Sequence, residues 1–288
     1  MLDQPELTVI MPVYNMEKYL ARALDHLAAQ NDSNFKLLIV NDGSKDKTRE
    51  IAESYRDKFR YFRIINKPNG GLSDTRNVGM DNVDTPYFTF HDGDDWVDPG
   101  YTAYFVRAFH EHPEAAMVSC GFWIDYEDKN GKDSIPATKK PIHRMLTKAQ
   151  TYRQIVNFLG SLFFNKAFVS PVKGYTWNKG YKTSVVRKHN LRFVKKLAFM
   201  EDQIFNVRYL SLTDGFYCDS VSLYHYWQRN DSMVHNFNLK MVPDNFKANY
   251  IVWKIILSSL WNEHKRNSRR SQSNLISIDE GNSNERKG

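Results

Sequence analysis

Residues 85–96 read Thr85-Pro86-Tyr87-Phe88-Thr89-Phe90-His91-Asp92-Gly93-Asp94-Asp95-Trp96. The first half is rich in aromatic and β-branched residues, which predicts a short buried strand. Three carboxylates follow at its C-terminal end, where they repel one another and lose solvation unless a positive group lies between them. Hard oxygen ligands at this spacing suit Mg²⁺ or Mn²⁺, ions that are commonly shared with substrate phosphates. The alternative interpretation is an ordinary Asp/Gly turn.

Upstream of this acidic segment, apolar strand-like runs alternate with helical patterns. We expect strands over residues 7–14, 35–40, 62–65 and 87–90. Helices are expected over 17–29, after the turn at 41–44 through about residue 57, and around Arg76 and Asn77. Asn15 is a good N-cap for the first helix. The alternation predicts an α/β fold with a mostly parallel sheet flanked by helices. Ligands of such sheets bind outside the carboxyl ends of the strands, so the polar clusters should converge on one crevice.

Downstream of Trp96 the pattern is looser. We expect strands within residues 115–126, an exposed loop over 128–141 and helices over 147–168. A connector over 177–193, a helix over 201–210 and strands within 216–226 should follow. The polar end of the chain, 271–288, is predicted to be disordered.

Composition narrows the possible functions. The chain has 288 residues, of which 41% are hydrophobic, and a net charge of +7 that suits nucleic acid, an anionic membrane surface or a phosphate-bearing substrate. Zinc-finger spacing and RNA-binding aromatic strands are missing, which argues against nucleic acid. Only two cysteines occur, Cys120 and Cys218, so we expect a reducing, cytoplasmic setting. We expect neither a secretory signal nor a membrane-spanning segment.

The turn Asn41-Asp42-Gly43-Ser44 follows the second expected strand. Its carboxylate could accept hydrogen bonds from a base N–H or from ribose hydroxyls, and Arg76 could meet a base or a phosphate. The G-x-G-x-x-G and G-x-x-x-x-G-K-[ST] fingerprints are missing, so dinucleotide oxidoreductases and P-loop enzymes lose support. Together with the acidic segment, this turn indicates a nucleotide-and-metal site.

At this point the chain resembles a known family, the family 2 glycosyltransferases, which use nucleotide sugars and have the GT-A fold. Order and spacing agree over about the first hundred residues. The matching motifs are Val9-Ile10-Met11-Pro12-Val13-Tyr14-Asn15, Val40-Asn41-Asp42-Gly43-Ser44, Gly70-Gly71-Leu72-Ser73-Asp74-Thr75-Arg76-Asn77 and His91-Asp92-Gly93-Asp94-Asp95-Trp96.

Three later segments are also similar to the family. They are Trp177-Asn178-Lys179, the Glu201-Asp202 pair within Met200–Phe205, and Tyr224–Ser232. The family's membrane-embedded synthases carry Gln-x-x-Arg-Trp between transmembrane helices. Here only Trp227-Gln228-Arg229 is loosely similar, which argues against coupled polymer synthesis and export.

The resemblance implies an inverting, metal-assisted single displacement and a role for each matching residue. Asp202 would be the base with Glu201 beside it, Asp94 a ligand of Mn²⁺ or Mg²⁺, and Asp92 a ligand of ribose or metal. Nucleotide-sugar contacts would come from Pro12, Tyr14, Asn15, Asp42, Arg76 and Arg229. For four other residues two interpretations stay open. Asp95 is either a helix cap or a ligand, and His225 is either a metal ligand or a hydrogen-bonded core residue. Arg229 lies either near the diphosphate or on the surface, and Trp177 lies either in the core or against a sugar.

We expect a GT-A catalytic domain over residues 1–235, with a nucleotide-binding half (1–100) and an acceptor half (101–235). A helical segment (236–266) and a polar tail (267–288) follow. Tyr250, Trp253, Leu257 and Leu260 share one helical face with Trp261 at its edge, and a basic run follows. Such a helix either contacts the membrane interface or packs on the catalytic domain.

The expected reaction moves a hexose or N-acetylhexosamine from a UDP-sugar to a hydroxyl of a cell-surface glycan, teichoic acid or lipid-linked acceptor. The enzyme would work in the cytoplasm, at the inner face of the membrane if the helix binds there. The alternatives are an enzyme that extends a protein O-glycan, a non-catalytic nucleotide-sugar binding module, and a nucleotidyltransferase. The last of these would need a Gly-rich basic N-terminal loop that the chain lacks.

Overall fold

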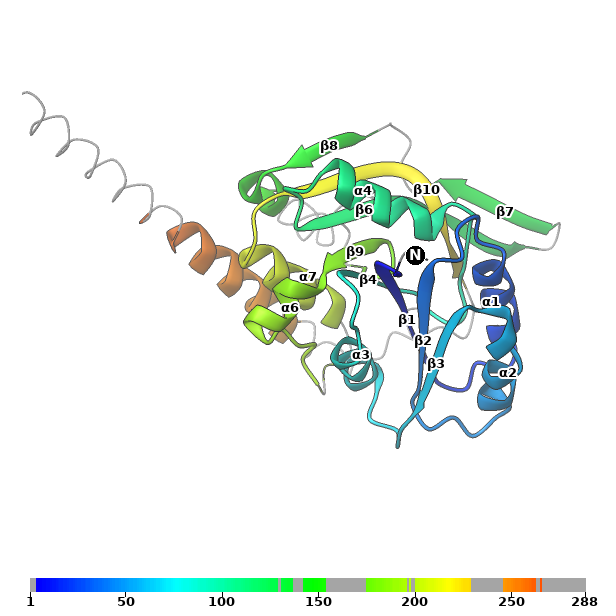
Figure 1. The fold of residues 1–288 in the computed structure, drawn as a ribbon. Coiled ribbons are helices and arrows are strands. Elements are labelled where there is room, and N and C mark those ends of the chain that lie inside the picture. Colours follow the sequence, from blue (N-terminus) through cyan, green and yellow to red (C-terminus); the bar gives the residue numbers. More distant parts are fainter. Residues whose placement is uncertain are drawn as a thin grey trace, which may run out of the picture.

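The computed structural model describes residues 4–128, 131–136, 142–153, 175–195, 197, 200–228, 246–262 and 265. Helices flank one large sheet (Figure 1). The strands are β1 (Leu7–Val13), β2 (Phe35–Asn41), β3 (Tyr61–Asn66), β4 (Tyr87–Phe90), β5 (Trp96–Val97), β6 (Met117–Asp128), β7 (Gly131–Pro136), β8 (His143–Leu146), β9 (Lys179–Lys182) and β10 (Phe216–Gln228). The helices are α1 (Leu20–Ala28), α2 (Thr48–Ser54), the 3₁₀ turn η1 (Arg56–Lys58), α3 (Leu72–Asp81), α4 (Tyr101–Glu111), α6 (Thr183–His189) and α7 (Glu201–Ser211). Residues 148–153 and 246–262 are also helical.

The sheet runs in the order β3-β2-β1-β4-β9-β6-β10-β5, with β7 paired to β6 and β8 paired to β10. The first four strands are parallel to one another, as the alternation of strands and helices predicts. β9 then pairs antiparallel with both β4 and β6. β6 and β10 are parallel, whereas β5, β7 and β8 pair antiparallel. The sheet is therefore parallel in its first half and mixed in its second.

Both faces of the sheet are covered, because successive side chains of a strand point to opposite faces. In β1, Leu7, Val9 and Met11 pack in a cluster with residues of α1 and α4. Ile10 points the other way, into a second cluster formed with α3, α6, α7 and the helix over residues 246–262. The acidic segment and the turns after β1 and β2 lie between these layers, at the carboxyl edge of the sheet.

Two segments differ from expectation. The expected loop over 128–141 contains β7, which forms an antiparallel hairpin with β6. The expected connector over 177–193 contains α6 and the short strand β9 in the middle of the sheet. A four-residue strand with one glycine and two lysines has no alternating pattern. Its place comes from pairing with strands far away in sequence.

The expected cap at Asn15 is also wrong. Asn15 has a left-handed φ of 52°, and α1 begins later, at Leu20. Of the helices expected over 147–168, the structure describes residues 148–153, and the rest lies outside the described residues. The helix over 246–262 falls inside the expected helical segment. In the described part of the chain, no helix has the length and apolarity needed to cross a bilayer.

Candidate active site

The loops that follow β1 and β2 lock together at the carboxyl edge of the sheet. The Asn15 backbone N–H donates to Ser44 Oγ at 3.0 Å, and Asn15 Oδ1 accepts from the Lys45 N–H at 2.9 Å. The Met16 N–H donates to Thr48 Oγ1 at 2.6 Å. Two of the motifs found in the sequence are thus in direct contact, although they lie about thirty residues apart.

Asp42 organises the next loop along the sheet. Its carboxylate accepts the backbone N–H groups of Gly70 and Gly71, each at 2.8 Å, and pairs closely with Lys67. Lys67 also reaches Asp74 at 2.9 Å. Asp42 is 3% exposed, so the side chain expected to contact the nucleoside already receives three protein donors. The contact with the nucleoside stays a prediction.

Arg76 lies at the centre of an acidic cluster. Its Nη2 is 3.3 Å from Asp92 Oδ1, and its Nη1 is 3.1 Å from Glu201 Oε1 and pairs closely with Asp202. Burial by itself would lower the pKa of Arg76, but the charges of Asp202, Asp92 and Glu201 raise it above its ordinary value. The guanidinium is 2% exposed and fully charged. α3, the end of β4 and the start of α7 therefore meet at one cation.

The carboxylates around Arg76 differ in their environments. Burial raises the pKa of Asp92 to about 6, with further contributions from Asp94 and Asp202 and an opposing one from Arg76. Burial and the neighbouring Asp202 also raise the pKa of Glu201. One cation thus offsets only part of the repulsion among these acids. A second cation beside these carboxylates would therefore be electrostatically favourable.

Asp92 and Asp94 fit a hard divalent cation. Within the described ranges, no group of three or more His, Cys, Asp and Glu side chains is arranged to hold a metal. Mg²⁺ needs no such cage, because it is usually held by one or two carboxylates together with substrate phosphates. Carboxylate oxygens are also the ligand type that Mg²⁺ and Mn²⁺ prefer. The donors present therefore match the metal that the sequence predicts.

Thr176 orients Asp202, and sequence reasoning missed it. Its backbone N–H and its Oγ1 lie 3.2 and 3.1 Å from Asp202 Oδ2, and it is fully buried. Because Arg76 contacts the other oxygen, both oxygens of the Asp202 carboxylate have fixed partners. A single threonine before Trp177 forms no pattern. Its place directly before a matched motif was the only signal available.

Arg22 of α1 holds the backbone of the acidic segment. Its Nη2 donates to the backbone oxygen of Asp94 at 2.7 Å. Its guanidinium lies 4.0 Å from the Trp96 ring and 4.9 Å from the Trp227 ring, distances typical of cation–π contacts. The backbone of the metal-binding candidate is thus fixed by a residue of α1 that the sequence motifs do not include.

Asp95 has a structural role that the expected helix cap does not describe. It is 1% exposed and accepts the Tyr224 hydroxyl at 2.6 Å and the Trp227 backbone N–H at 2.9 Å. The next helix, α4, begins several residues later, after Gly100. Asp95 therefore ties the acidic segment to β10, and burial raises its pKa well above the ordinary value.

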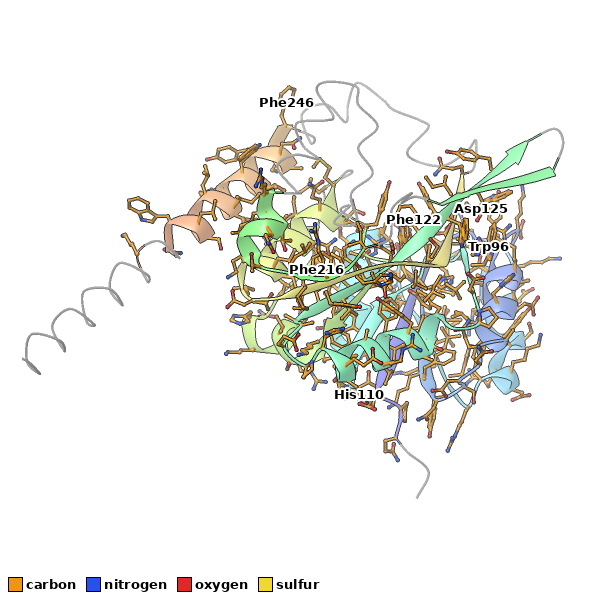
Figure 2. All side chains as sticks on the ribbon, turned by 90° about the horizontal axis from the view of Figure 1, so that it is seen from above. Trp96, His110, Phe122, Asp125, Phe216 and Phe246 are labelled. Carbon is orange, nitrogen blue, oxygen red and sulfur yellow. The ribbon has the colours of Figure 1, made fainter. Side chains whose placement is uncertain are left out.

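His225 and Trp177 lie in the second half of the sheet. His225 Nδ1 is 2.8 Å from Asp125 Oδ2, and its Nε2 is 3.4 Å from Asp98 Oδ1. These carboxylates are not the ones that surround Arg76, and a metal contact for His225 stays a prediction. Trp177 is 2% exposed and stacks on Tyr224 at 4.3 Å, so of its two interpretations the core is the correct one. Figure 2 shows Trp96, the stacking partner of His225, beside Asp125.

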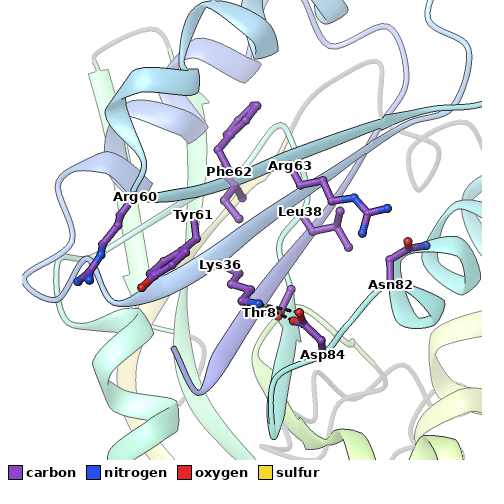
Figure 3. A pocket seen from close by; sticks show the side chains of 10 residues that line it. Thr8, Lys36, Leu38, Arg60, Tyr61, Phe62, Arg63, Asn82 and Asp84 are labelled. Carbon is purple, nitrogen blue, oxygen red and sulfur yellow. Dashed lines mark hydrogen bonds and ion pairs between the residues drawn. The ribbon is translucent and has the colours of Figure 1, made fainter. Parts of the chain in front are cut away.

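The remaining predicted residues lie at the rim or outside the description. Pro12 is buried in β1, and Tyr14 is exposed at its end. Arg229 lies outside the described residues. A pocket of about 340 Å³ occurs elsewhere, at the amino end of β1–β3, where Lys36 pairs with Asp84 (Figure 3). It lies at the edge opposite to the motifs and takes no part in this site.

Comparison with known proteins decides the family. The model of "Glycosyl transferase family 2" matches residues 8–170, which is more than half of the chain. The chain belongs to glycosyltransferase family 2. EpsH of Bacillus subtilis (strain 168) is 31% identical over 249 residues, covering 83% of this chain and 66% of EpsH. Residues 1–349 of S. aureus TarS, crystallised with UDP-GlcNAc, share the fold with a TM-score of 0.67 at 22% identity, covering 89% of this chain and 67% of that one.

A third relative is the teichoic acid poly(glycerol phosphate) polymerase of Staphylococcus epidermidis (strain ATCC 35984 / RP62A). It is 28% identical over 215 residues, which cover 73% of this chain but 27% of the polymerase. The chain thus spans 66% of EpsH and 27% of the polymerase. The family and the GT-A fold are established, as the motifs predict.

We expect Arg76→Met to lower the free energy of unfolding by about 3–5 kcal/mol, because three carboxylates lose their shared buried cation. Arg76→Lys should lower the free energy of unfolding less, since lysine keeps the positive charge but its compact ammonium group cannot contact all three carboxylates as the guanidinium does. Urea unfolding with unchanged m-values would measure both losses. A loss under about 1 kcal/mol for Arg76→Met would contradict the central role of this residue.

Thr176→Val keeps the backbone donor and the side-chain shape but removes the hydroxyl that orients Asp202. Hydrogen bonds to charged groups contribute about 1.5–3 kcal/mol, so kcat should fall by about one to two orders of magnitude. The KM for the donor should change little, and Thr176→Ser should restore kcat. Equal kcat values for the Val and Ser variants, measured with steady-state kinetics, would sink this assignment.

Proposed function

We propose that this protein is an inverting glycosyltransferase that moves a hexose or N-acetylhexosamine from a UDP-sugar to an acceptor hydroxyl. The observation that carries the proposal is the meeting of the acidic segment and the Glu201-Asp202 pair at Arg76. A family 2 domain needs a leaving-group site and a base on opposite sides of one sugar. In this proposal, the segment after β4 and the start of α7, more than a hundred positions apart, supply both.

Asp202 acts as the general base in this proposal. As the acceptor oxygen attacks the anomeric carbon, its proton moves to the Asp202 carboxylate, and the bond between that carbon and the UDP oxygen breaks. Attack opposite to the leaving group inverts the configuration. Arg76 and Thr176 hold the carboxylate in place. Glu201, with its raised pKa, stays beside it as a second proton-holding group.

Asp94, together with Asp92, would hold Mn²⁺ or Mg²⁺. Such an ion, when bound, offsets the charge that develops on the departing diphosphate. Arg22 keeps the Asp94 backbone in position for this role. Asp42, Arg76, Tyr14 and the loop around Asn15 border the region proposed for the nucleotide, with Pro12 beneath it. Arg229 stays a proposed nucleotide-sugar contact from the sequence motif alone.

The acceptor we propose is a cell-surface glycan, with teichoic acid or a lipid-linked precursor as the preferred class. One relative is named a teichoic acid poly(glycerol phosphate) polymerase, and the TarS structure contains UDP-GlcNAc. Both cysteines of the chain are free and buried, which agrees with work in a reducing cytoplasm. UDP-GlcNAc is therefore the donor to test first.

UDP release from a panel of UDP-sugars, with Mn²⁺, Mg²⁺ or a chelator, should reveal one preferred donor. We expect release to need the metal, and Asp94→Ala to weaken the apparent metal affinity by more than about tenfold. Arg49→Ala, on the exposed outer side of α2, is a control that should behave like wild type. Chelator-resistant release, with Asp94→Ala as active as wild type, would contradict the metal site.

Asp202→Asn should lower kcat by about 10²–10⁴-fold, because the amide cannot accept the acceptor proton. UDP binding, followed by calorimetry, should stay within a few fold of wild type. This pair of results separates an enzyme from a binding module, which would show UDP binding and no turnover in either protein. Full activity of Asp202→Asn would show that another group is the base.

A further inference from the structure

The helix over residues 246–262 has two apolar faces. Its inner face packs into the core cluster that also contains residues of α6 and α7, and there Ala248, Val252 and Ile256 are at most 1% exposed. Of the ten large hydrophobic side chains that are exposed among the described residues, six lie on the outer face of this one helix. They are Phe246, Tyr250, Trp253, Leu257, Leu260 and Trp261, each 39–69% exposed.

The outer residues form a continuous stripe. They follow one another at steps of three or four residues, with Trp261 directly after Leu260, so they share one side of an α-helix. Figure 2 shows Phe246 projecting from the helix at one end of this stripe. Exposed apolar groups of this size on a soluble surface mark an interaction site.

Positive charge runs beside the stripe. Lys247 and Lys254 are the only charged residues between positions 246 and 262, and both are exposed. Lys265 follows, so the three lysines are separated by seven and eleven residues. At 3.6 residues per turn, Lys247 and Lys254 are about two turns apart, which puts them on one line along the helix. Three arginines come next in the sequence, Arg266, Arg269 and Arg270.

We propose that this outer face docks on an anionic phospholipid surface. A helix with Trp, Tyr and Leu on one side and lysines along the edge lies in the plane of the membrane interface, with its apolar side chains among the acyl chains. The lysine stems extend along the apolar region while the ammonium groups reach the lipid phosphates. A second copy of this chain fits less well, since an antiparallel two-fold contact through the stripe would bring the two lysine rows together.

The helix that carries the docking face contacts the residue that precedes the Glu201-Asp202 pair. Asn249, between the inner and outer faces, has its Nδ2 3.7 Å from the sulfur of Met200. Met200 has a left-handed φ of 65° and directly precedes Glu201 and Asp202. A bilayer bound by this helix would therefore hold lipid-linked acceptors on the same side of the sheet as the start of α7, which carries the proposed base. The choice of a lipid-linked acceptor rests on the proposed function, whereas binding to lipid does not.

Vesicle co-sedimentation of the full chain tests the docking face. Phosphatidylcholine vesicles should bind weakly, and vesicles that also contain phosphatidylglycerol should bind strongly and lose the protein at high salt. Tyr250→Ser/Leu257→Ser should weaken binding by more than about tenfold. Lys247→Gln/Lys254→Gln should weaken it by roughly fivefold per lysine. Val221→Ser and Arg49→Gln/Arg60→Gln, which alter exposed residues on other elements, are the matched controls.

Two outcomes would overturn the proposal. Unchanged vesicle binding by Tyr250→Ser/Leu257→Ser would assign lipid affinity to the basic run alone. Self-association of the chain that disappears in this variant, without lipid binding, would assign the stripe to a second copy. Because UDP release in solution is measured without lipid, loss of vesicle binding with normal UDP release separates this proposal from the proposed function. Circular dichroism confirms that the variants keep their fold.

Discussion

The buried guanidinium of Arg76 is the contact on which the candidate site depends. It joins α3 to the end of β4 and to α7, across sequence separations of 16, 125 and 126 residues. The rings of Phe90 and Phe193 lie 5.8 and 5.4 Å from the guanidinium, so the cation is enclosed by apolar groups as well as by carboxylates. Without it, Asp92, Glu201 and Asp202 would repel one another in a poorly hydrated space. Arg76 therefore links these three segments through opposite charges that are buried together.

The same arrangement separates the roles of neighbouring carboxylates. Asp202 has Arg76 on one oxygen and Thr176 on the other, whereas the pKa of Glu201 is raised by burial and by Asp202. In the acidic segment, the buried Asp95 carboxylate accepts the Tyr224 hydroxyl, whereas the backbone oxygen of Asp94 accepts a hydrogen bond from Arg22. Adjacent acids with different environments can do different work, because environment sets the proton affinity of each.

The first half of the fold follows from local patterns, and much of the second half does not. Apolar runs alternating with amphipathic helices predict β1 to β4, because strands that are buried on both faces are nearly continuous runs of apolar residues. β7 and β9 have no such pattern and are fixed by their partners. Among site residues, Asp42, Arg76, Asp92, Glu201 and Asp202 are found through ordered motifs, whereas Thr176, Lys67 and Arg22 are not. Nothing in a sequence distinguishes Asp95, a structural acid, from Asp94, until burial is known.

β9 explains how the two halves are held at the correct distance. It pairs with β4 on one side and with β6 on the other, and Thr176 lies just before it. Its Gly180 leaves no space for a side chain, since a Cβ there would lie 2.7 Å from the Phe105 ring and 3.0 Å from that of Phe109. The strand can therefore approach α4 closely enough to pair on both edges. A four-residue strand thus fixes where Thr176 meets Asp202, and through it where the proposed base stands relative to the acidic segment after β4.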